Sequence, residues 1–292
     1  MMNKTRRKKL DTVLTYVILI LLAAFIVIPV LWMLSTAFKT EAQTYYPNPK
    51  WLPDPFSLES FHKFFNTYTF GQMTVNSLIT CLAAMVICVA CACLAAMVIC
   101  VACACLAGYG ITRFKFKGRK QLLNFLLITQ MFPSVMLVVP FYAVLSKYHL
   151  TNTLLGLIVV YAATNVAFST WMLVSYFKTV PIELDEAARV DGASSFCIFR
   201  KIILPLILPG IAAVAMFVLF NGWNEYMYSS VLVSKDSLKT LTVGIVALNS
   251  QYQIKWNDLM AASTVSSLPL VILFVCFQKY FIAGMTGGAV KS

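Results

Sequence analysis

Paired cysteines are the first residues in this sequence whose spacing could do chemistry. Cys88 and Cys91, followed by Cys100 and Cys103, give the pattern C-x2-C-x8-C-x2-C, which is close to the spacing of a metal site. The segment is continuously apolar and is predicted to be helical. Twelve residues turn a helix by about 1200°, so the second pair would lie about 120° round and about 18 Å from the first. Four ligands could not converge, and we predict no metal site and no disulfide framework. The cysteines are instead small residues that let helices pack closely in lipid.

The elements that carry these residues are membrane spans. The chain has 292 residues, of which 60% are hydrophobic and 12% charged, and a soluble domain would carry about twice that charge. Apolar stretches near 20 residues recur, each long enough to cross a hydrocarbon core of about 30 Å. We predict an all-α membrane protein with six transmembrane helices. They lie at 13–36, 73–110, 121–146, 152–176, 208–232 and 258–283.

The excess of Lys and Arg residues is explained by the orientation of the protein in the membrane. The N-terminal segment resembles a signal peptide, but its apolar run is about 22 residues and too long for one, so we expect a retained first helix. With the N-terminus inside, 16 of the 23 Lys and Arg residues fall on the cytoplasmic side. Both termini are then cytoplasmic. Because no basic patch lies on a soluble domain, we predict no nucleic-acid partner for the net charge of +12.

The second predicted span is overlong because it contains a tandem duplication. CLAAMVICVACA stands at 81–92 and again, letter for letter, at 93–104. No polar or Gly/Pro turn separates the copies, so one long helix is favoured over a hairpin of two short spans. Lipid exposure demands only apolarity, and therefore the identity of the copies indicates a recent duplication, or an assembly error, with no functional need behind it.

The segment 180–210, VPIELDEAARVDGASSFCIFRKIILPLILPG, has the most informative pattern. Pro181 can open a helix whose first turn is acidic, which suits the positive end of the helix dipole. Gly192 can end this helix in a left-handed conformation. A second short helix follows, and we expect Pro205 to stop it. The result is a helix–turn–helix on the cytoplasmic side. The alternative interpretation is that the segment is only an amphipathic connector that rests on the lipid headgroups.

This segment resembles the EAA loop of ABC-importer permeases at every defining position. Those positions are the following residues: Glu186, Ala187, Ala188, Gly192, Ile202, Leu204 and Pro205. In that family the loop is a coupling element that sits in a cleft of the cytoplasmic ATPase. The flanking charges Arg189, Asp191, Arg200 and Lys201 could pair with that partner. Small alanines would permit close approach, and a helix in a groove is a recurrent recognition mode.

The resemblance covers nearly the whole chain and is greatest to the carbohydrate-uptake subgroup, the maltose-type second permease. It rests on WLPDPFSLESFHKFF, ITRFKFKGR, TQMFPSVMLVVPFY, NGWNEYMYSSVLV and the tail GMTGGAVK. The departures are a missing proline near Val166, Ser292 in place of a final glycine, and the twelve-residue insertion. The resemblance implies the MetI-like ABC-importer permease fold in a bacterial or archaeal cell membrane. The chain then divides into a basic N-terminus at 1–12, the first helix at 13–36, an extracytoplasmic segment at 37–72, a permease domain at 73–283 and a cytoplasmic tail at 284–292.

The implied function is that of one membrane subunit of an ATP-driven sugar importer. The chain contains no G-x-x-x-x-G-K-[ST] phosphate loop, so ATP and Mg would be used by a partner and this chain would bind no cofactor of its own. The resemblance implies two copies of an ABC ATPase, a second permease and an extracytoplasmic solute-binding protein as partners. His62 and His149 are isolated, and no convergent set of catalytic residues predicts an enzyme.

Polar and aromatic residues at the outer half of the fifth predicted helix could line the translocation pathway, where aromatic faces and amides suit sugars. They are Asn221, Trp223, Asn224, Glu225 and Tyr226. They could equally form an interfacial belt or contact the partner permease. Two other functions stay open: a permease of the same fold for a non-sugar solute, and a secondary transporter without an ATPase, which would want more ionisable residues inside its spans.

Overall fold

A computed structural model describes residues 4–66, 70–82, 117–249 and 254–289 of the chain. The described part is helical apart from turns and one isolated bridge between Asn249 and Ile254. It divides into two compact units, which are described separately. Most of the predicted second span, including the second copy of the duplication, lies outside the described residues.

The first unit combines residues 1–71 with 245–268. Its longest element is α1 (Lys4–Ala37), followed by the short α2 (Glu41–Thr44) and by α3 (Glu59–Asn66). An aromatic group orders the segment after α1, because Phe38 stacks on Phe56 at 4.8 Å and lies 4.9 Å from Phe61. The backbone N–H of Ser57 also donates to the carbonyl of Phe38. The segment predicted to be extracytoplasmic is thus tied back to the end of the first helix.

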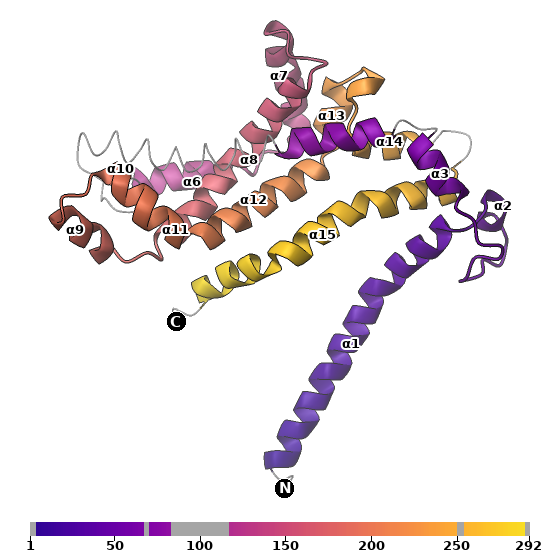
Figure 1. The fold of residues 1–292 in the computed structure, drawn as a ribbon, viewed down its shortest axis with the longest axis horizontal. Helices are drawn as coiled ribbons and strands as arrows, with labels where there is room; N and C mark the ends of the chain where they lie inside the picture. The colour runs from indigo at the N-terminus through magenta and orange to yellow at the C-terminus, as the bar shows by residue number, and fades with distance from the viewer. Residues whose placement is uncertain (1–3, 67–69, 83–116, 250–253, 290–292) are drawn as a thin grey trace. The chain divides into compact units, whose positions relative to one another are not determined.

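The second unit combines residues 72–244 with 269–292. Its centre is the pair formed by α8 (Leu154–Phe177) and α12 (Leu208–Trp223), which pack side by side (Figure 1). Thr153 begins α8 by accepting a hydrogen bond from the N–H of Gly156 at 3.0 Å, as an N-cap does. Gly210 permits the close approach of α12 to α8, since a Cβ there would come within 2.6 Å of Tyr176 Cδ2.

Figure 1 also labels the other helices of the described residues. They are α6 (Arg119–Thr129), α7 (Ser134–Lys147), α9 (Glu183–Val190), α10 (Ser195–Ile198), α11 (Leu204–Leu206), α13 (Met227–Leu232), α14 (Leu241–Ala247) and α15 (Trp256–Ala289). A π-helical turn, η1 (Phe199–Ile203), joins α10 to α11, and a 3-10 turn, η2 (Asp236–Leu238), precedes α14. Residues 70–82 are also helical.

Three helical stretches among the described residues are long and apolar enough to cross a membrane. They are Asp11–Ala37, Leu154–Phe177 and Trp256–Gln278, which coincide with the predicted first, fourth and sixth spans. The bent pair Ser195–Leu206 and Leu208–Trp223 makes a fourth candidate. Because 83–116 lies outside the described residues, the count of six spans and the cytoplasmic position of both termini stay predictions.

Two predicted spans are not continuous helices. The third, 121–146, is interrupted between Thr129 and Ser134, because Pro133 lacks an N–H and disfavours a helical conformation for the residue before it. The fifth, 208–232, breaks between Trp223 and Met227. The sequence prediction treated both stretches as continuous spans, although Pro133 marks the first break and Asn224 and Glu225 mark the second.

Candidate functional site

The loop between α8 and α12 forms a helix–turn–helix, as predicted. Its first helix, α9, has Glu183, Asp185 and Glu186 in the first turn. Gly192 has a positive φ of 79°, and the N–H of the following Ala193 donates to the carbonyl of Ala188 at 3.0 Å. The chain therefore turns sharply after α9 through a conformation that glycine adopts without strain.

The second helix of the loop does not stop at Pro205, which corrects that prediction. Ser194 caps α10, and the chain then continues through η1 into α11, which contains Pro205 and ends at Leu206. A π-helical turn shifts the hydrogen-bond register by one residue, so the proline ring fits without breaking the helix. The break comes at Ile207, where the axis bends by 73° into α12.

The base of the loop is anchored in a hydrophobic core. Ile198 and Ile203 are fully or almost fully buried, together with Ala188 from α9. They pack with Leu173 and Phe177 from the end of α8 and with Val214 and Val218 from α12. Ile202 and Leu204, both predicted coupling residues, are partly buried against the same cluster. The loop therefore rests on the protein's own helices.

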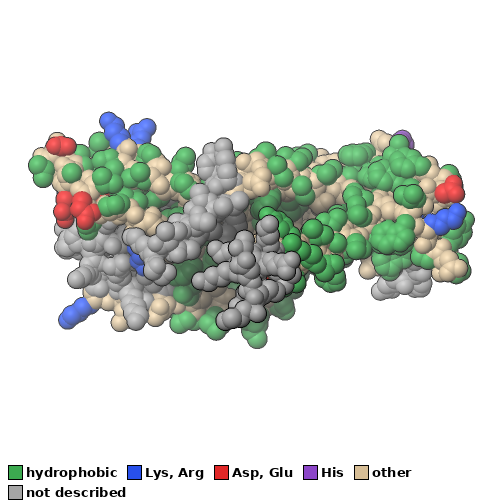
Figure 2. Space-filling model, turned by 90° about the horizontal axis from the view of Figure 1, so that it is seen from below, with side chains coloured by type: hydrophobic (Ala, Val, Ile, Leu, Met, Phe, Trp, Pro, Cys, Tyr) green, Lys and Arg blue, Asp and Glu red, His purple; other side chains and the backbone are tan. Residues whose placement is uncertain are grey.

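The tip of the loop is exposed. The predicted coupling residues Glu186, Ala187, Arg189, Asp191 and Gly192 are all exposed, as is Pro205 further along. Val190 is 88% exposed, which is unusual for an aliphatic side chain in an ordered helix. Of the predicted set, only Ala188 is buried. Figure 2 shows acidic side chains gathered where α9 lies, within a surface that is mostly hydrophobic.

The break in the fifth span is organised by Glu225. Its carboxylate accepts hydrogen bonds from the backbone N–H groups of Tyr228 at 2.7 Å and Ser229 at 3.0 Å, at the start of α13. It also accepts from the hydroxyl of Tyr161 on α8 at 2.9 Å. A carboxylate at a helix N-terminus satisfies donors that the helix leaves unpaired. Glu225 thus joins the start of α13 to the neighbouring span.

A second polar contact lies one helical turn away. Asn221 donates from Nδ2 to the Oδ1 of Asn165 at 3.1 Å. Tyr161 and Asn165 are four residues apart on α8, and Asn221 and Glu225 are four residues apart at the end of α12, so both pairs meet. Sequence reasoning missed Tyr161 and Asn165, although their spacing within an otherwise apolar span was the available signal.

The other predicted pathway residues lie in different environments. Asn224 is exposed and donates to the carbonyl of Phe220 at 2.8 Å, and Tyr226 is 42% exposed. Trp223 is only 3% exposed and belongs to the interior of the unit. The structure therefore brings Asn221 and Glu225 together with α8, and places Trp223 away from the surface.

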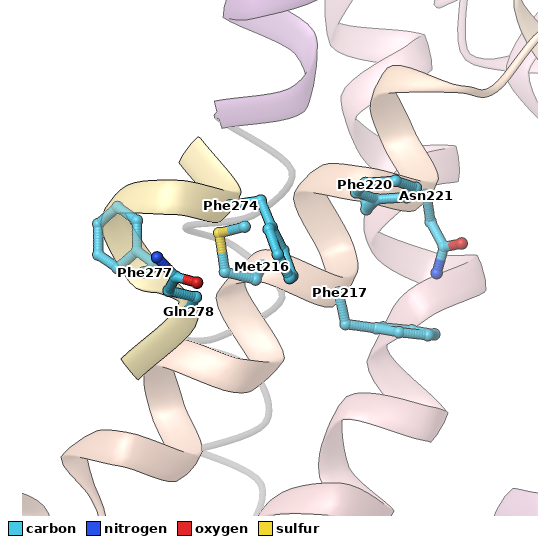
Figure 3. Close-up of a pocket in the computed structure, with 7 residues that line it drawn as sticks. All are labelled: Met216, Phe217, Phe220, Asn221, Phe274, Phe277 and Gln278. Atoms are coloured by element: carbon cyan, nitrogen blue, oxygen red, sulfur yellow. The ribbon is translucent and has the colours of Figure 1, made fainter. Parts of the chain in front are cut away.

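A cavity of about 300 Å³ lies between α12 and the C-terminal part of α15 (Figure 3). Its lining is the following: Met216, Phe217, Phe220 and Asn221 from α12, and Phe274, Phe277 and Gln278 from α15. The lining is almost wholly apolar and is dominated by four phenylalanine rings. The amide of Asn221 is already engaged with Asn165. Only Asn221 of this set was a sequence candidate, since pairing α12 with α15 requires the tertiary structure.

Metal ligation has no support in the described residues, where no group of three or more His, Cys, Asp or Glu could hold an ion. Cys88, Cys91, Cys100 and Cys103 lie outside those residues. The cysteines whose side chains are described, Cys81, Cys197 and Cys276, are free.

The fold is mostly helical, with long apolar spans and a helix–turn–helix that projects from its core. These features indicate a component of a membrane transport system, and comparison with known proteins agrees. The family "Binding-protein-dependent transport system inner membrane component" matches residues 100–287. The chain is 32% identical to the probable ABC transporter permease YurM of Bacillus subtilis, over 99% of this chain and 92% of that protein. It is 33% identical to the trehalose/maltose permease MalG of Thermococcus litoralis, over 98% and 99%.

Two solved structures share the fold. A bacterial ABC transporter that imports alginate matches with a TM-score of 0.75 at 20% identity, covering 96% of this chain and 99% of that one. An alginate transporter in complex with its pentasaccharide-bound periplasmic protein matches with a TM-score of 0.66 at 16% identity, covering 93% of each. The chain belongs to the binding-protein-dependent transport family. It is an inner-membrane ABC transporter permease of the carbohydrate-uptake subgroup.

Proposed function

We propose that this chain is one of two permeases that together form the translocation pathway of an ATP-driven sugar importer, and that α9 transmits the ATPase's movement to it. The observation that carries the coupling role is the contrast within one loop. Its tip is exposed through Glu186, Ala187 and Val190, while its base is buried through Ile198 and Ile203. A partner that displaces the tip would move α8 and α12 with it, because the base packs on both helices.

The partners follow from the family and from the relatives. An ABC ATPase in two copies would use ATP and Mg, since this chain has no phosphate-binding loop. A second permease would complete the pathway, and a solute-binding protein would deliver the sugar. The alginate transporter was solved in complex with such a protein, a periplasmic protein that carries alginate pentasaccharide. Closure of the ATPase dimer would shift the permeases between inward-facing and outward-facing states.

The coupling role is tested with Gly192→Pro and Glu186→Lys. Proline cannot adopt the positive φ at position 192, and the charge reversal alters the exposed tip without touching the core. Both variants should reach the membrane but should lose co-purification of the ATPase and stimulated ATP hydrolysis. Asp11→Lys, a reversal at another exposed site, is the control. Normal ATPase binding and stimulation in both variants would refute the role.

The sugar assignment rests on the sugars named for the relatives. Uptake of labelled oligosaccharides by the complete reconstituted importer tests it. ATP-dependent uptake of a non-sugar solute alone would favour the alternative permease function. Uptake that needs an ion gradient and no ATPase would favour a secondary transporter.

A further inference from the structure

A further cavity, also about 300 Å³, lies in the first unit where the first span ends. Two helices supply Trp32 and Thr36 (α1) and Trp256 and Met260 (α15) to its lining. The other lining residues are Gln43 and Thr44 of α2, and Lys39 and Pro49 on either side of that helix. The lining therefore contains two indole rings and several polar groups, with one cation and no acid. Neither the family nor the proposed transport function assigns it a role.

Lys39 is the charged group of this cavity. It is 3% exposed, and its Nζ lies 4.0 Å from the centre of the Trp32 ring. Among the described residues no carboxylate lies within ion-pair distance of it. Burial lowers the pKa of Lys39, because dehydration disfavours the ammonium form. The ring face compensates this cost only in part, so an anion in the cavity would be stabilised.

Thr36 adds an unused hydrogen-bonding group. It lines the same cavity, is 6% exposed, and its Oγ1 has no hydrogen-bond partner in the described part of the chain. Gln43, in contrast, is already engaged, since its Oε1 accepts from the N–H of Thr40 at 3.1 Å and its Nε2 donates to the carbonyl of Pro55 at 3.2 Å. Buried polar groups normally find partners, so the Thr36 hydroxyl and the Lys39 ammonium together match one acceptor-rich anion.

The position of the cavity indicates where that anion comes from. The most apolar 18-residue stretch of the span Asp11–Ala37 has no buried residue, and exposed side chains such as Ile28 and Leu31 lead directly to Trp32. Tryptophan is enriched where spans meet the headgroup layer. We propose that this cavity binds the headgroup phosphate of an anionic phospholipid, with Lys39 Nζ and Thr36 Oγ1 contacting the phosphate and an acyl chain lying along α1.

Native mass spectrometry of the complete importer, delipidated in detergent and titrated with phosphatidylglycerol, tests the proposal. Lys39→Met should weaken the site about tenfold, the usual effect of losing one charge-assisted hydrogen bond. Thr36→Val should weaken it about threefold. The control Lys50→Met removes the same charge from the same segment, at a side chain that is 69% exposed and paired with Asp54, and should bind like the wild type.

Comparison ligands distinguish a lipid headgroup from a soluble phosphate as the source of the anion. Phosphatidylcholine should bind more weakly than phosphatidylglycerol, and inorganic phosphate or glycerol 3-phosphate should not protect the protein from thermal unfolding. Protection by the soluble phosphates equal to that by the lipid would overturn the lipid assignment. So would loss of the second permease from the Lys39→Met complex, which would show that a partner's acidic group fills the cavity.

Thr36→Val keeps the proposal testable if Lys39→Met does not assemble. Removing a buried hydroxyl that has no partner among the described residues should leave the Tm without lipid unchanged or slightly higher. The same variant should lose part of the stabilisation that phosphatidylglycerol gives the wild type. An unchanged affinity for phosphatidylglycerol in this variant would reject the site.

Discussion

Replacing Glu225 by alanine should destabilise the permease, because one carboxylate serves three donors from two elements. Each buried donor left without an acceptor costs about 1–3 kcal/mol. The two backbone donors at the start of α13 can recover part of this through water, so we expect a total loss of about 2–5 kcal/mol. Glu225→Gln keeps one acceptor oxygen and should cost about 1–2 kcal/mol.

Thermal unfolding of the purified complex in detergent measures this loss. For a chain of this size a change of 1 kcal/mol moves Tm by about 2–4 °C, so Glu225→Ala should lower it by roughly 5–15 °C. Glu183→Ala, which removes an exposed acid from α9, is the control and should change Tm little. Tyr161→Phe removes one of the three donors together with its need for an acceptor.

The double variant Glu225→Ala/Tyr161→Phe isolates the contact between α8 and the break. If the hydrogen bond at 2.9 Å matters, the double variant should be less destabilised than the sum of the singles by about 1 kcal/mol. Strict additivity, or a Tm of Glu225→Ala equal to that of the wild type, would show that the carboxylate does not hold the two elements together.

Three further outcomes are expected. Gly210→Ala should lower Tm, because its Cβ would meet the Tyr176 ring and overpacking costs about 1–3 kcal/mol; an unchanged Tm would mean that the helices separate freely. We predict that the outer segment 233–257 contacts the solute-binding protein, so Lys235→Glu should weaken docking of that protein. The control Lys178→Glu should not weaken it, and equal docking of the two variants would contradict the predicted contact. Deletion of 93–104 should improve sugar uptake, because the repeat adds nothing to transport and disturbs the packing of the second span. Uptake that is no better, or that is lost, would make the duplication part of the mechanism.

The sequence alone was sufficient for the class of protein and for the helix–turn–helix between α8 and α12. Spans near 20 apolar residues must be helical, because lipid offers the backbone no hydrogen-bond partners. The acidic first turn and Gly192 predicted a helix followed by a left-handed turn, and the structure has both. These features depend on neighbours in the sequence, and local patterns predict such features well.

Only the tertiary structure decided which side chains meet. Pro205 lies inside a helix because a π-helical turn before it absorbs the ring, and the core under Ile198 and Ile203 holds that turn in place. Glu225 is matched to Tyr161 from a helix that begins 71 residues earlier in the chain. The packing of the helices decides which side chains become partners, because many helix faces in the sequence have the same apolar pattern. In a membrane, apolarity does not discriminate among those faces, so the residues at a break or a cavity become evident only once the helices have packed.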